Sequence, residues 1–377
     1  MGILRTNTLS GIGTNGPVFD GVTRLDTQGY FVPPPGTTDQ RSAGITTTQG
    51  AIRFNTDSQK LEFYAQDQWF VMMTENVGLG TGGDTGAGAR GVFAGGSSPG
   101  IIHDTIDYIN IASTGNAQDF GVLSGSRQRL SSCSNSTRGV FGGGIAPAPT
   151  SIVNVIEFIT ISSTGNTQDF GDLITAKSFS SACSSSTRGI FGGGYVAPTT
   201  RINVIEYITI ASTGDAKYFG DLTTVKSNWN ACSSSTRGIF GGGTTPTIVN
   251  VIEFITISTL GNATDFGDLT AVRDAAAACS NSTRGVFGGG YLSPNNTNAI
   301  DFITISTLGN ATDFGDLSAA KNSLNACSSP IRGVFAGGSG NVIEYITILT
   351  QGNAIDFGDL FQARYALAAC SNAHGGL

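Results

Sequence analysis

One unit of 43 to 50 residues recurs six times between residues 90 and 377, and this repeat constrains the possible fold more than any other feature of the sequence. Each unit contains a cysteine, a phenylalanine 13 residues before it, and an acidic residue another 13 before that. The cysteines are Cys133, Cys183, Cys232, Cys279, Cys327 and Cys370. The differences in length fall in one stretch of the unit, between the GGG or AGG triplet and the acidic residue.

Each unit is predicted to form four short strands separated by turns. The first strand reads AACSSS, the second RGVFGGG, the third VIEYITI and the fourth ATDFGDL, with small changes between units. The third is apolar on both faces and should be covered on both sides. Four strands in a repeat of this length are typical of a β-propeller blade. A solenoid, which needs capping repeats at both ends, is the alternative.

The two ends of the repeat region favour a closed ring. The first unit starts at Arg90 and lacks the AACSSS strand, whereas the last unit finishes with that strand at residues 368–372 and has no RGVF after it. Pairing of the two ends would complete the first unit and remove the exposed sheet edges. The sequence therefore predicts an all-β protein, a six-bladed β-propeller at residues 90–377 whose ends are closed by the C-terminal strand.

Residues 1–77 lie outside the repeat. Residues 1–35 are predicted to be an N-terminal segment that ends in three prolines, and residues 36–77 a small β module. In this module AIRFN and KLEFYA predict two strands joined by a TDSQ turn, and QWFVMM predicts a third. A sheet this small needs a partner surface for stability. Residues 78–89 contain six glycines and are predicted to be a flexible hinge.

Charge and hydropathy exclude several classes of partner. Lys and Arg number 20 and Asp and Glu 27, which gives a net charge of −7 with no run of like charge. Nucleic-acid binding requires a basic face, so no nucleic-acid partner is expected. No apolar stretch approaches the roughly 18–20 residues of a membrane span, so no membrane partner is expected either.

Two parts of the chain resemble known families. The VFGGG pattern followed by an aromatic residue on the next strand (Tyr207, Phe254, Tyr345) resembles kelch-like propellers. It departs from the kelch pattern because no tryptophan follows that aromatic at short spacing, and a Phe-Gly-Asp-Leu comes twelve residues after it instead. The longer pattern TRGVFGGG…VIEYITIASTGNA…DFGDL is similar to glycine-rich repeats in virion proteins of marine bacteriophages, cyanophages among them. The string TTDQR…GAIRFNTD…KLEFYA…W resembles a small β module of phage tail-fibre proteins.

The phage resemblance implies a non-enzymatic virion protein, a fibre or adhesin assembled in the host cytoplasm. Residues 1–77 would attach it to other virion proteins, and the propeller would bind a glycan or protein of the host surface. By analogy with phage fibres, a homotrimer is expected. Two alternatives stay open: a decoration or connector protein whose propeller binds other virion proteins, and a propeller enzyme that hydrolyses surface glycan.

The stretches of variable length give the candidate recognition residues. They lie at residues 97–105, 145–154, 195–203, 244–250, 291–299 and 339–341. In an up-and-down blade, these loops share one face with the crossovers between blades, and loops on a rigid scaffold commonly carry recognition. Unconstrained drift would produce the same variation. The aromatic, basic and amide groups suited to sugars are Tyr195, Arg201, Tyr291, Asn295 and Asn296.

The residues that could carry chemistry have structural explanations. The two histidines, His103 and His374, lack partners at metal-ligand spacing, so no metal, cofactor or catalytic residue is predicted. The six cysteines are interpreted as buried small side chains, with a metal-binding thiolate ring as the alternative. Arg90 and its equivalents are predicted to pair with Asp119, Asp169, Asp265, Asp313 and Asp356; Tyr218 replaces this aspartate in the third unit. The equivalents are Arg138, Arg188, Arg237, Arg284 and Arg332.

Overall fold

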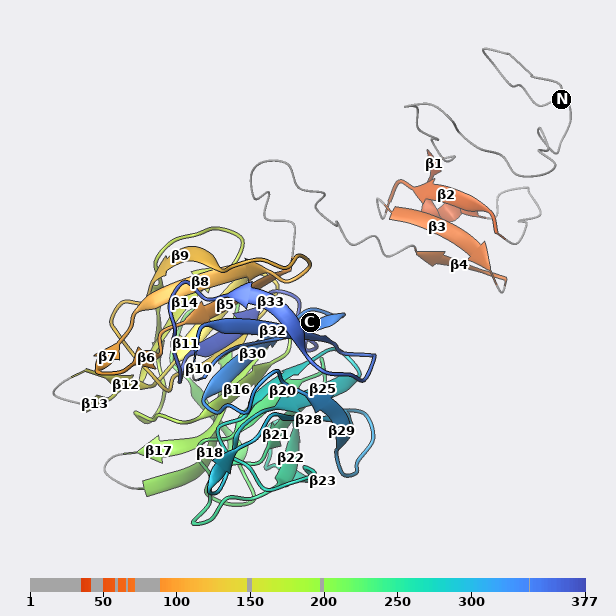
Figure 1. The fold of residues 1–377 in the computed structure, drawn as a ribbon. Coiled ribbons are helices and arrows are strands. Elements are labelled where there is room, and N and C mark those ends of the chain that lie inside the picture. Colours follow the sequence, from red (N-terminus) through yellow and green to blue (C-terminus); the bar gives the residue numbers. More distant parts are fainter. Residues whose placement is uncertain are drawn as a thin grey trace, which may run out of the picture. The chain divides into compact units, whose positions relative to one another are not determined.

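The computed structural model describes residues 35–41, 50–57, 60–65, 67–71, 89–147, 151–196, 200–338 and 340–377. These residues are all-β apart from one short 3-10 helix, and none of their helices is long and apolar enough to cross a membrane. The chain divides into two compact units, Met1–Asn76 and Val77–Leu377 (Figure 1). The segment predicted at 1–35 and the hinge predicted at 78–89 lie outside the described residues, except for Pro35 and Ala89.

The first unit contains one four-stranded sheet in the order β1-β2-β3-β4. Its elements are β1 (Pro35–Gly36), the 3-10 helix η1 (Thr38–Arg41), β2 (Ile52–Asn55), β3 (Lys60–Ala65) and β4 (Gln68–Val71). The last three strands coincide with those predicted and pair antiparallel. The sequence analysis missed β1, which pairs parallel to β2, and η1.

The second unit contains six four-stranded antiparallel sheets, numbered here by the unit that supplies their second strand. The first strands are β34 (Ala368–Ser371), β10 (Ser131–Ser134), β16 (Ser181–Ser184), β20 (Asn230–Ser233), β24 (Ala277–Ser280) and β30 (Leu324–Ser328). The second strands are β5 (Arg90–Ala94), β11 (Arg138–Gly142), β17 (Arg188–Val196), β21 (Arg237–Gly241), β25 (Arg284–Gly288) and β31 (Arg332–Gly337).

The outer two strands of each sheet follow in sequence. The third strands are β8 (Thr105–Asn110), β14 (Val155–Thr160), β18 (Thr200–Thr209), β22 (Val251–Thr256), β28 (Ala299–Thr304) and β32 (Val342–Thr347). The fourth strands are β9 (Gln118–Val122), β15 (Gln168–Asp172), β19 (Lys217–Asp221), β23 (Thr264–Asp268), β29 (Thr312–Asp316) and β33 (Ile355–Asp359). All four strands lie where the repeat predicts them.

The first sheet is assembled from both ends of the repeat region. β34 pairs antiparallel with β5, with Cys370 opposite Val92, and so supplies the strand that the first unit lacks. Each first strand also contacts the first strands of two other sheets, and β34 contacts both β30 and β10. The first strands therefore form an unbroken cycle of contacts.

A cycle of hydrogen bonds follows the same path. The serine after each cysteine donates its hydroxyl to the carbonyl of the equivalent serine in the preceding sheet, at 2.6–2.8 Å. The donors in order are Ser134, Ser371, Ser328, Ser280, Ser233 and Ser184, and the last donates to Ser134 again. Each of these buried hydroxyls is thus satisfied by a neighbouring sheet.

The hydrophobic core lies between neighbouring sheets. One cluster joins Ile156 and Phe170 of the second sheet to Phe191 and Ile208 of the third, and equivalent clusters join the other neighbours. Residues of alternate orientation on the third strand are buried, which confirms the predicted cover on both of its faces.

Glycine permits this close approach. A Cβ on Gly285 of the fifth sheet would lie 2.8 Å from Cys232 Sγ of the fourth. On the fourth strands, Gly171 (φ +143°) lies against the backbone of Gly214 in the next sheet, where a Cβ would be 2.6 Å from the carbonyl carbon. Contacts between sheets thus account for part of the high glycine content.

Candidate functional site

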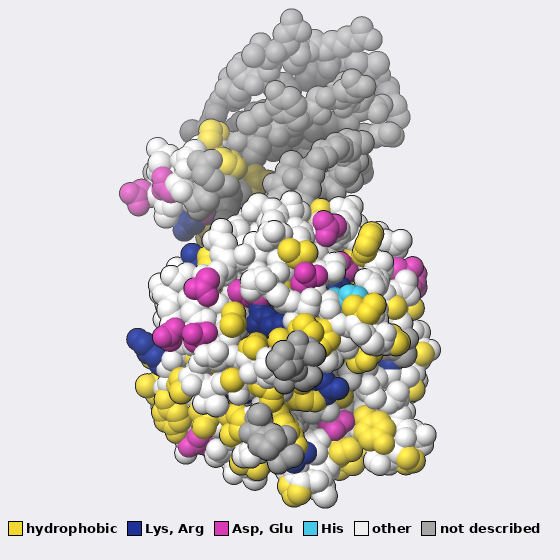
Figure 2. All heavy atoms as spheres, turned by 90° about the vertical axis from the view of Figure 1, so that its left-hand side faces the viewer, with side chains coloured by type: hydrophobic (Ala, Val, Ile, Leu, Met, Phe, Trp, Pro, Cys, Tyr) yellow, Lys and Arg dark blue, Asp and Glu magenta, His cyan; other side chains and the backbone are white. Residues whose placement is uncertain are grey.

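The stretches of variable length lie together at one end of the sheets, which we call the variable face. Four of the six form the hairpins β6–β7 (Ser97–Ser98 and Ile101–Ile102), β12–β13 (Ile145–Ala146 and Ser151–Ile152) and β26–β27 (Tyr291–Leu292 and Asn295–Asn296), and the extension of the β17–β18 ladder. Residues 148–150, 197–199 and 339 of these stretches are outside the described part. This face is at the left of Figure 1 and toward the viewer in Figure 2, where both basic and acidic side chains are scattered among hydrophobic and uncharged ones.

The bases of the hairpins pair with the segments that lead to the first strands. Backbone bridges join Gln128 to Ile145 and Ser178 to Tyr195, and equivalent bridges are made in the first, fourth and fifth sheets. Loops and crossovers therefore share this face, as predicted.

A ring of six equivalent residues lies just before the first strands. All six have left-handed backbones with φ between 49° and 61° although none is glycine. They are Arg129, Phe179, Asn228, Ala275, Ser323 and Ala366. Each backbone N–H donates to the carbonyl of the equivalent residue in the preceding sheet, at 2.8–3.1 Å. This second closed cycle holds a conformation that costs roughly 1–2 kcal/mol per residue.

Side-chain identity changes around this ring while the backbone stays the same. A cavity of about 70 Å³ lies at the ring, lined also by the residues that follow it, among them Leu130, Trp229 and Leu324. The indole N–H of Trp229 is buried and has no hydrogen-bond partner within the described residues. The cavity has room for a few water molecules only, so a larger ligand would have to lie over it.

Two of the predicted recognition residues meet this ring. Arg129 Cζ lies 3.9 Å from the ring centroid of Phe179, whose ring lies 6.0 Å from that of Tyr195, and Arg201 Cζ lies 5.3 Å from Tyr195. These four partly buried side chains, which we call the cation–aromatic row, cross from the second sheet to the third. Arg201 Nε also donates to Ser227 Oγ at 3.0 Å. Sequence reasoning missed Arg129 and Phe179, because they lie outside the stretches of variable length.

The other three predicted residues lie apart from the row. Tyr291, Asn295 and Asn296 belong to the β26–β27 hairpin of the fifth sheet, two sheets further along the chain. Asn295 and Asn296 are exposed, and Asn296 Oδ1 accepts a hydrogen bond from Asn322 at 2.7 Å. The structure thus divides the predicted set into two separate groups.

The opposite end of the first strands is repetitive and covered. The Cys-Ser residues of all six units, and the alanine before them in five units, line a cavity of about 60 Å³, and His374 from the segment after β34 also lines it. His374 Nε2 lies 2.9 Å from the Ser134 carbonyl, and the Gly375 N–H donates to the Ser280 carbonyl at 3.0 Å. Burial lowers the pKa of His374, partly offset by this carbonyl. The Cys-Ser pair at this end is therefore the same in every unit, and its neighbours vary little.

The cysteines are buried and free. Burial raises the pKa of Cys232 and Cys370 to about 12, and it raises the pKa of the other four as well. Among the described residues, no group of His, Cys, Asp or Glu is arranged to hold a metal ion. The thiolate-ring alternative accordingly receives no support.

The predicted pairing of Arg90 and its equivalents with the aspartates is wrong. Arg138 Nη1 donates to the Ile210 carbonyl of the next sheet at 3.0 Å, and its Cζ lies 4.5 Å from the ring of Phe158. The other five arginines make the same two contacts, and no ion pair among the described residues joins them to the aspartates. A guanidinium can satisfy a carbonyl through its edge while its face lies on an aromatic ring.

The third-strand carboxylates instead pair with a basic residue that sequence reasoning missed. Lys177 Nζ of one sheet lies 2.9 Å from Glu206 Oε1 of the next, and both side chains are fully buried. The equivalent pairs are Arg127–Glu157, Lys226–Glu253, Arg273–Asp301, Lys321–Glu344 and Arg364–Asp107. The signal was present, since each basic residue precedes its cysteine by six positions. These carboxylates therefore serve to hold neighbouring sheets together.

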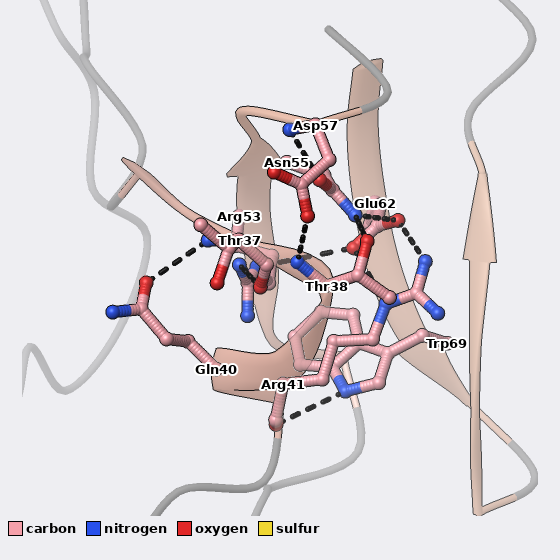
Figure 3. A network of polar contacts seen from close by, with 9 residues as sticks. All are labelled: Thr37, Thr38, Gln40, Arg41, Arg53, Asn55, Asp57, Glu62 and Trp69. Atoms are coloured by element: carbon pink, nitrogen blue, oxygen red, sulfur yellow. Dashed lines mark hydrogen bonds and ion pairs between the residues drawn. The ribbon is translucent and has the colours of Figure 1, made fainter.

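The residues of the string TTDQR…GAIRFNTD…KLEFYA…W in the first unit form a polar network around Glu62 (Figure 3). Glu62 has no exposed side-chain surface and pairs with Arg41 of η1, and it accepts a hydrogen bond from Asn55 at 2.8 Å. Arg53 Nη2 donates to the Thr37 carbonyl at 2.7 Å, and the Trp69 indole N–H donates to the Arg41 carbonyl at 3.3 Å. The residues of the string therefore hold η1 against the sheet.

No protein-family model matches the chain, and no curated protein matches its sequence significantly.

Proposed function

We propose that the chain is a non-enzymatic structural protein of a bacteriophage virion, a fibre or adhesin in which a six-bladed β-propeller binds a glycan of the host surface. The pairing of β34 with β5 and the cycle of contacts among the first strands support a closed propeller with the six sheets as blades. The resemblance of the repeat and of the N-terminal string to phage virion proteins supports a location in a phage virion.

The contrast between the two ends of the sheets is the observation that carries the binding role. One end carries the same Cys-Ser pair in all six units, and His374 lines the cavity there. The variable face carries hairpins of differing length and the cation–aromatic row beside a ring of differing side chains. Aromatic faces and amide and guanidinium donors are the groups with which proteins bind sugars and polar surfaces.

The buried ion pairs support a non-enzymatic role. Glycoside hydrolysis requires two carboxyl groups at one cleft. The carboxylates that recur on the third strands have at most 1% of their side-chain surface exposed, and each one is paired with Lys or Arg.

A connector or decoration protein is the second candidate. On the face of the first unit's sheet opposite Glu62, the cross-strand neighbours Ile52, Phe63 and Phe70 form an apolar row, and Ile52 and Phe70 are 46% and 38% exposed. Such a row suits contact with another virion protein or with copies of this chain. The homotrimer expected by analogy stays a prediction, which the mass in solution tests.

A glycan array and purified cyanobacterial lipopolysaccharide, each probed with the full chain, test the adhesin role. We expect saccharide binding that Tyr195→Ala weakens and Tyr218→Ala does not, because Tyr218 is exposed on β19 away from the variable face. Absence of saccharide binding by the folded protein, together with retention on phage particles, would favour the connector.

A further inference from the structure

Arg129 and Arg201 differ from most other basic residues of the second unit in having no repeated structural role. Residues 89–377 contain 15 Lys and Arg residues. Six form the ion pairs between sheets, and six bind a carbonyl and an aromatic ring. Only Arg129, Arg201 and Lys217 remain, and two of these three belong to the cation–aromatic row.

Arg129 is a partly buried cation without an anion. Its side-chain contact within the described residues is the face-on contact with Phe179, and no carboxylate or acceptor there binds its N–H groups. Burial lowers the pKa of Arg129, and the nearby Tyr365 partly offsets this by raising it. The guanidinium nevertheless stays charged at neutral pH. Stacking uses the face of the guanidinium and leaves the N–H donors at its edge for a ligand.

Arg201 occupies the other end of the same row. It stacks on Tyr195 and donates only Nε, to Ser227, so its remaining donors have no partner in the described part of the chain. Two rings therefore lie between two guanidinium groups. This order suits a saccharide that carries an anionic group. The C–H faces of the sugar would pack on the aromatic rings, and the anionic group would make a bidentate contact with a guanidinium.

We propose that the cation–aromatic row of Arg129, Phe179, Tyr195 and Arg201 binds an acidic saccharide, a sugar that bears a carboxylate or a sulfate. The inference rests on the proposed glycan-binding role and adds the chemical class of the sugar. The cavity at the ring is too small for a sugar ring, so the saccharide lies over the surface. Because the row offers only two guanidinium groups and the chain as a whole carries a net charge of −7, a saccharide with a single anionic substituent suits it better than a polyanion.

Calorimetric titration of the full chain with three forms of one disaccharide tests this inference: the neutral parent, a form that bears one carboxylate and a form that bears one sulfate. We expect one of the anionic sugars to bind at least tenfold more tightly than the neutral one, and less tightly at high salt. The carboxylated and sulfated arms distinguish the two anionic groups.

Variants then locate the site. Arg129→Ala and Arg201→Ala should each weaken binding about tenfold or more, and Lys217→Ala, which removes the same charge from β19, should leave it within about twofold. Alanine occupies the position equivalent to Arg129 at Ala275 and Ala366, so the backbone accepts it. Arg201→Ala, outside the ring, keeps the test independent if Arg129→Ala fails to fold.

Three outcomes would overturn the inference. Equal affinity for the neutral sugar, with loss on Tyr195→Ala, leaves the proposed function standing without acidic selectivity. Equal weakening by Lys217→Ala would indicate attraction to overall charge instead of a site. A folded protein that binds no saccharide of either charge would remove the proposed function and this inference together.

Discussion

Arg364 and Asp107 are separated by 257 residues in the sequence, and their side chains form a buried ion pair at 2.6 Å. Arg364 follows the fourth strand of the sixth sheet, and Asp107 lies on the third strand of the first. Arg364 also donates to the carbonyls of Gly95 and Thr105. This pair completes the series of six and joins the last sheet to the first.

Arg364→Met should destabilise the protein by about 3–5 kcal/mol at pH 8, because it leaves a buried carboxylate unpaired. Burial already raises the pKa of Asp107 even with Arg364 beside it. A carboxyl with a raised folded-state pKa keeps its proton in the folded state and releases it on unfolding, so the stability of the variant should fall as the pH rises above about 4. Urea unfolding at pH 5 and pH 8 measures both effects, and a smaller loss is expected at pH 5.

Arg364→Lys is the matched control, since lysine occupies the equivalent position at Lys177, Lys226 and Lys321. It should cost less than about 1.5 kcal/mol, the scale of a typical hydrogen bond. A loss of stability in Arg364→Lys as large as that in Arg364→Met would contradict the role of the ion pair. A loss in Arg364→Met that does not change with pH would contradict it as well.

Gly285→Ala should cost about 1–3 kcal/mol through overpacking, because the new Cβ would lie 2.8 Å from Cys232 Sγ. Cys232→Ala removes that sulfur, so the double variant should be more stable than the sum of the two single losses by at least about 1 kcal/mol. Thermal unfolding of the four proteins gives the coupling. Gly125→Ala is the control, because a Cβ added at Gly125 would have no neighbouring atom within 4 Å. Additive losses would show that the two residues do not clash.

His374→Asn should remove part of the acid sensitivity of the protein. Burial holds the pKa of His374 below its ordinary value of 6.5, so the unfolded state binds a proton before the folded state does. This contribution is fully present above about pH 6.5 and is lost as the pH falls below it, at up to about 1.4 kcal/mol per pH unit. Unfolding free energies between pH 7.5 and 5.5 should therefore fall less in the variant than in the wild type.

His103 has a pKa lowered by burial as well. Because it is present in both proteins, its contribution cancels from the difference, and His103→Asn provides the reciprocal control. An identical slope in the wild type and in His374→Asn would show that His374 is not held neutral.

Glu62→Gln should destabilise the first unit alone by about 3 kcal/mol, because Arg41 and Arg53 lose the buried carboxylate that they share. Hydrogen exchange followed by mass spectrometry should show loss of protection in β2, β3 and β4 and none in the second unit, since the two units are separately compact. Exchange that rises equally in both units would contradict this. Asp39→Asn, on an exposed residue of η1, is the control.

The repeat made the strands predictable because their positions recur with constant spacing. The Cys370–Ser371 strand could be assigned to the first sheet for the same reason. The ion pairs were harder to find, because Lys177 and Glu206 belong to different sheets. An alignment of the six units shows that each position recurs, but it does not show that the two positions contact each other. The exchange of Lys for Arg between units hid the position further.

The ring at Arg129 and Phe179 could not be predicted. A left-handed backbone is normally signalled by glycine or asparagine, and only Asn228 of the six carries that signal. The cycle of hydrogen bonds between sheets imposes the conformation, and such a cycle exists only after the sheets have assembled. Tyr195 and Arg201 were found because the length of their hairpin varies, whereas their partners in the row lie where length does not.

The position of β5 has a mechanical consequence. This strand is the first described strand of the second unit, and it is hydrogen-bonded to β34 on one side and to β8 on the other. A pulling force transmitted along the chain to Arg90 therefore acts on two sets of backbone hydrogen bonds at once. An edge strand would be held by only one such set. Extracting β5 would also separate the strands at the beginning and the end of the repeat region, so resistance to pulling is shared by the whole cycle of sheets.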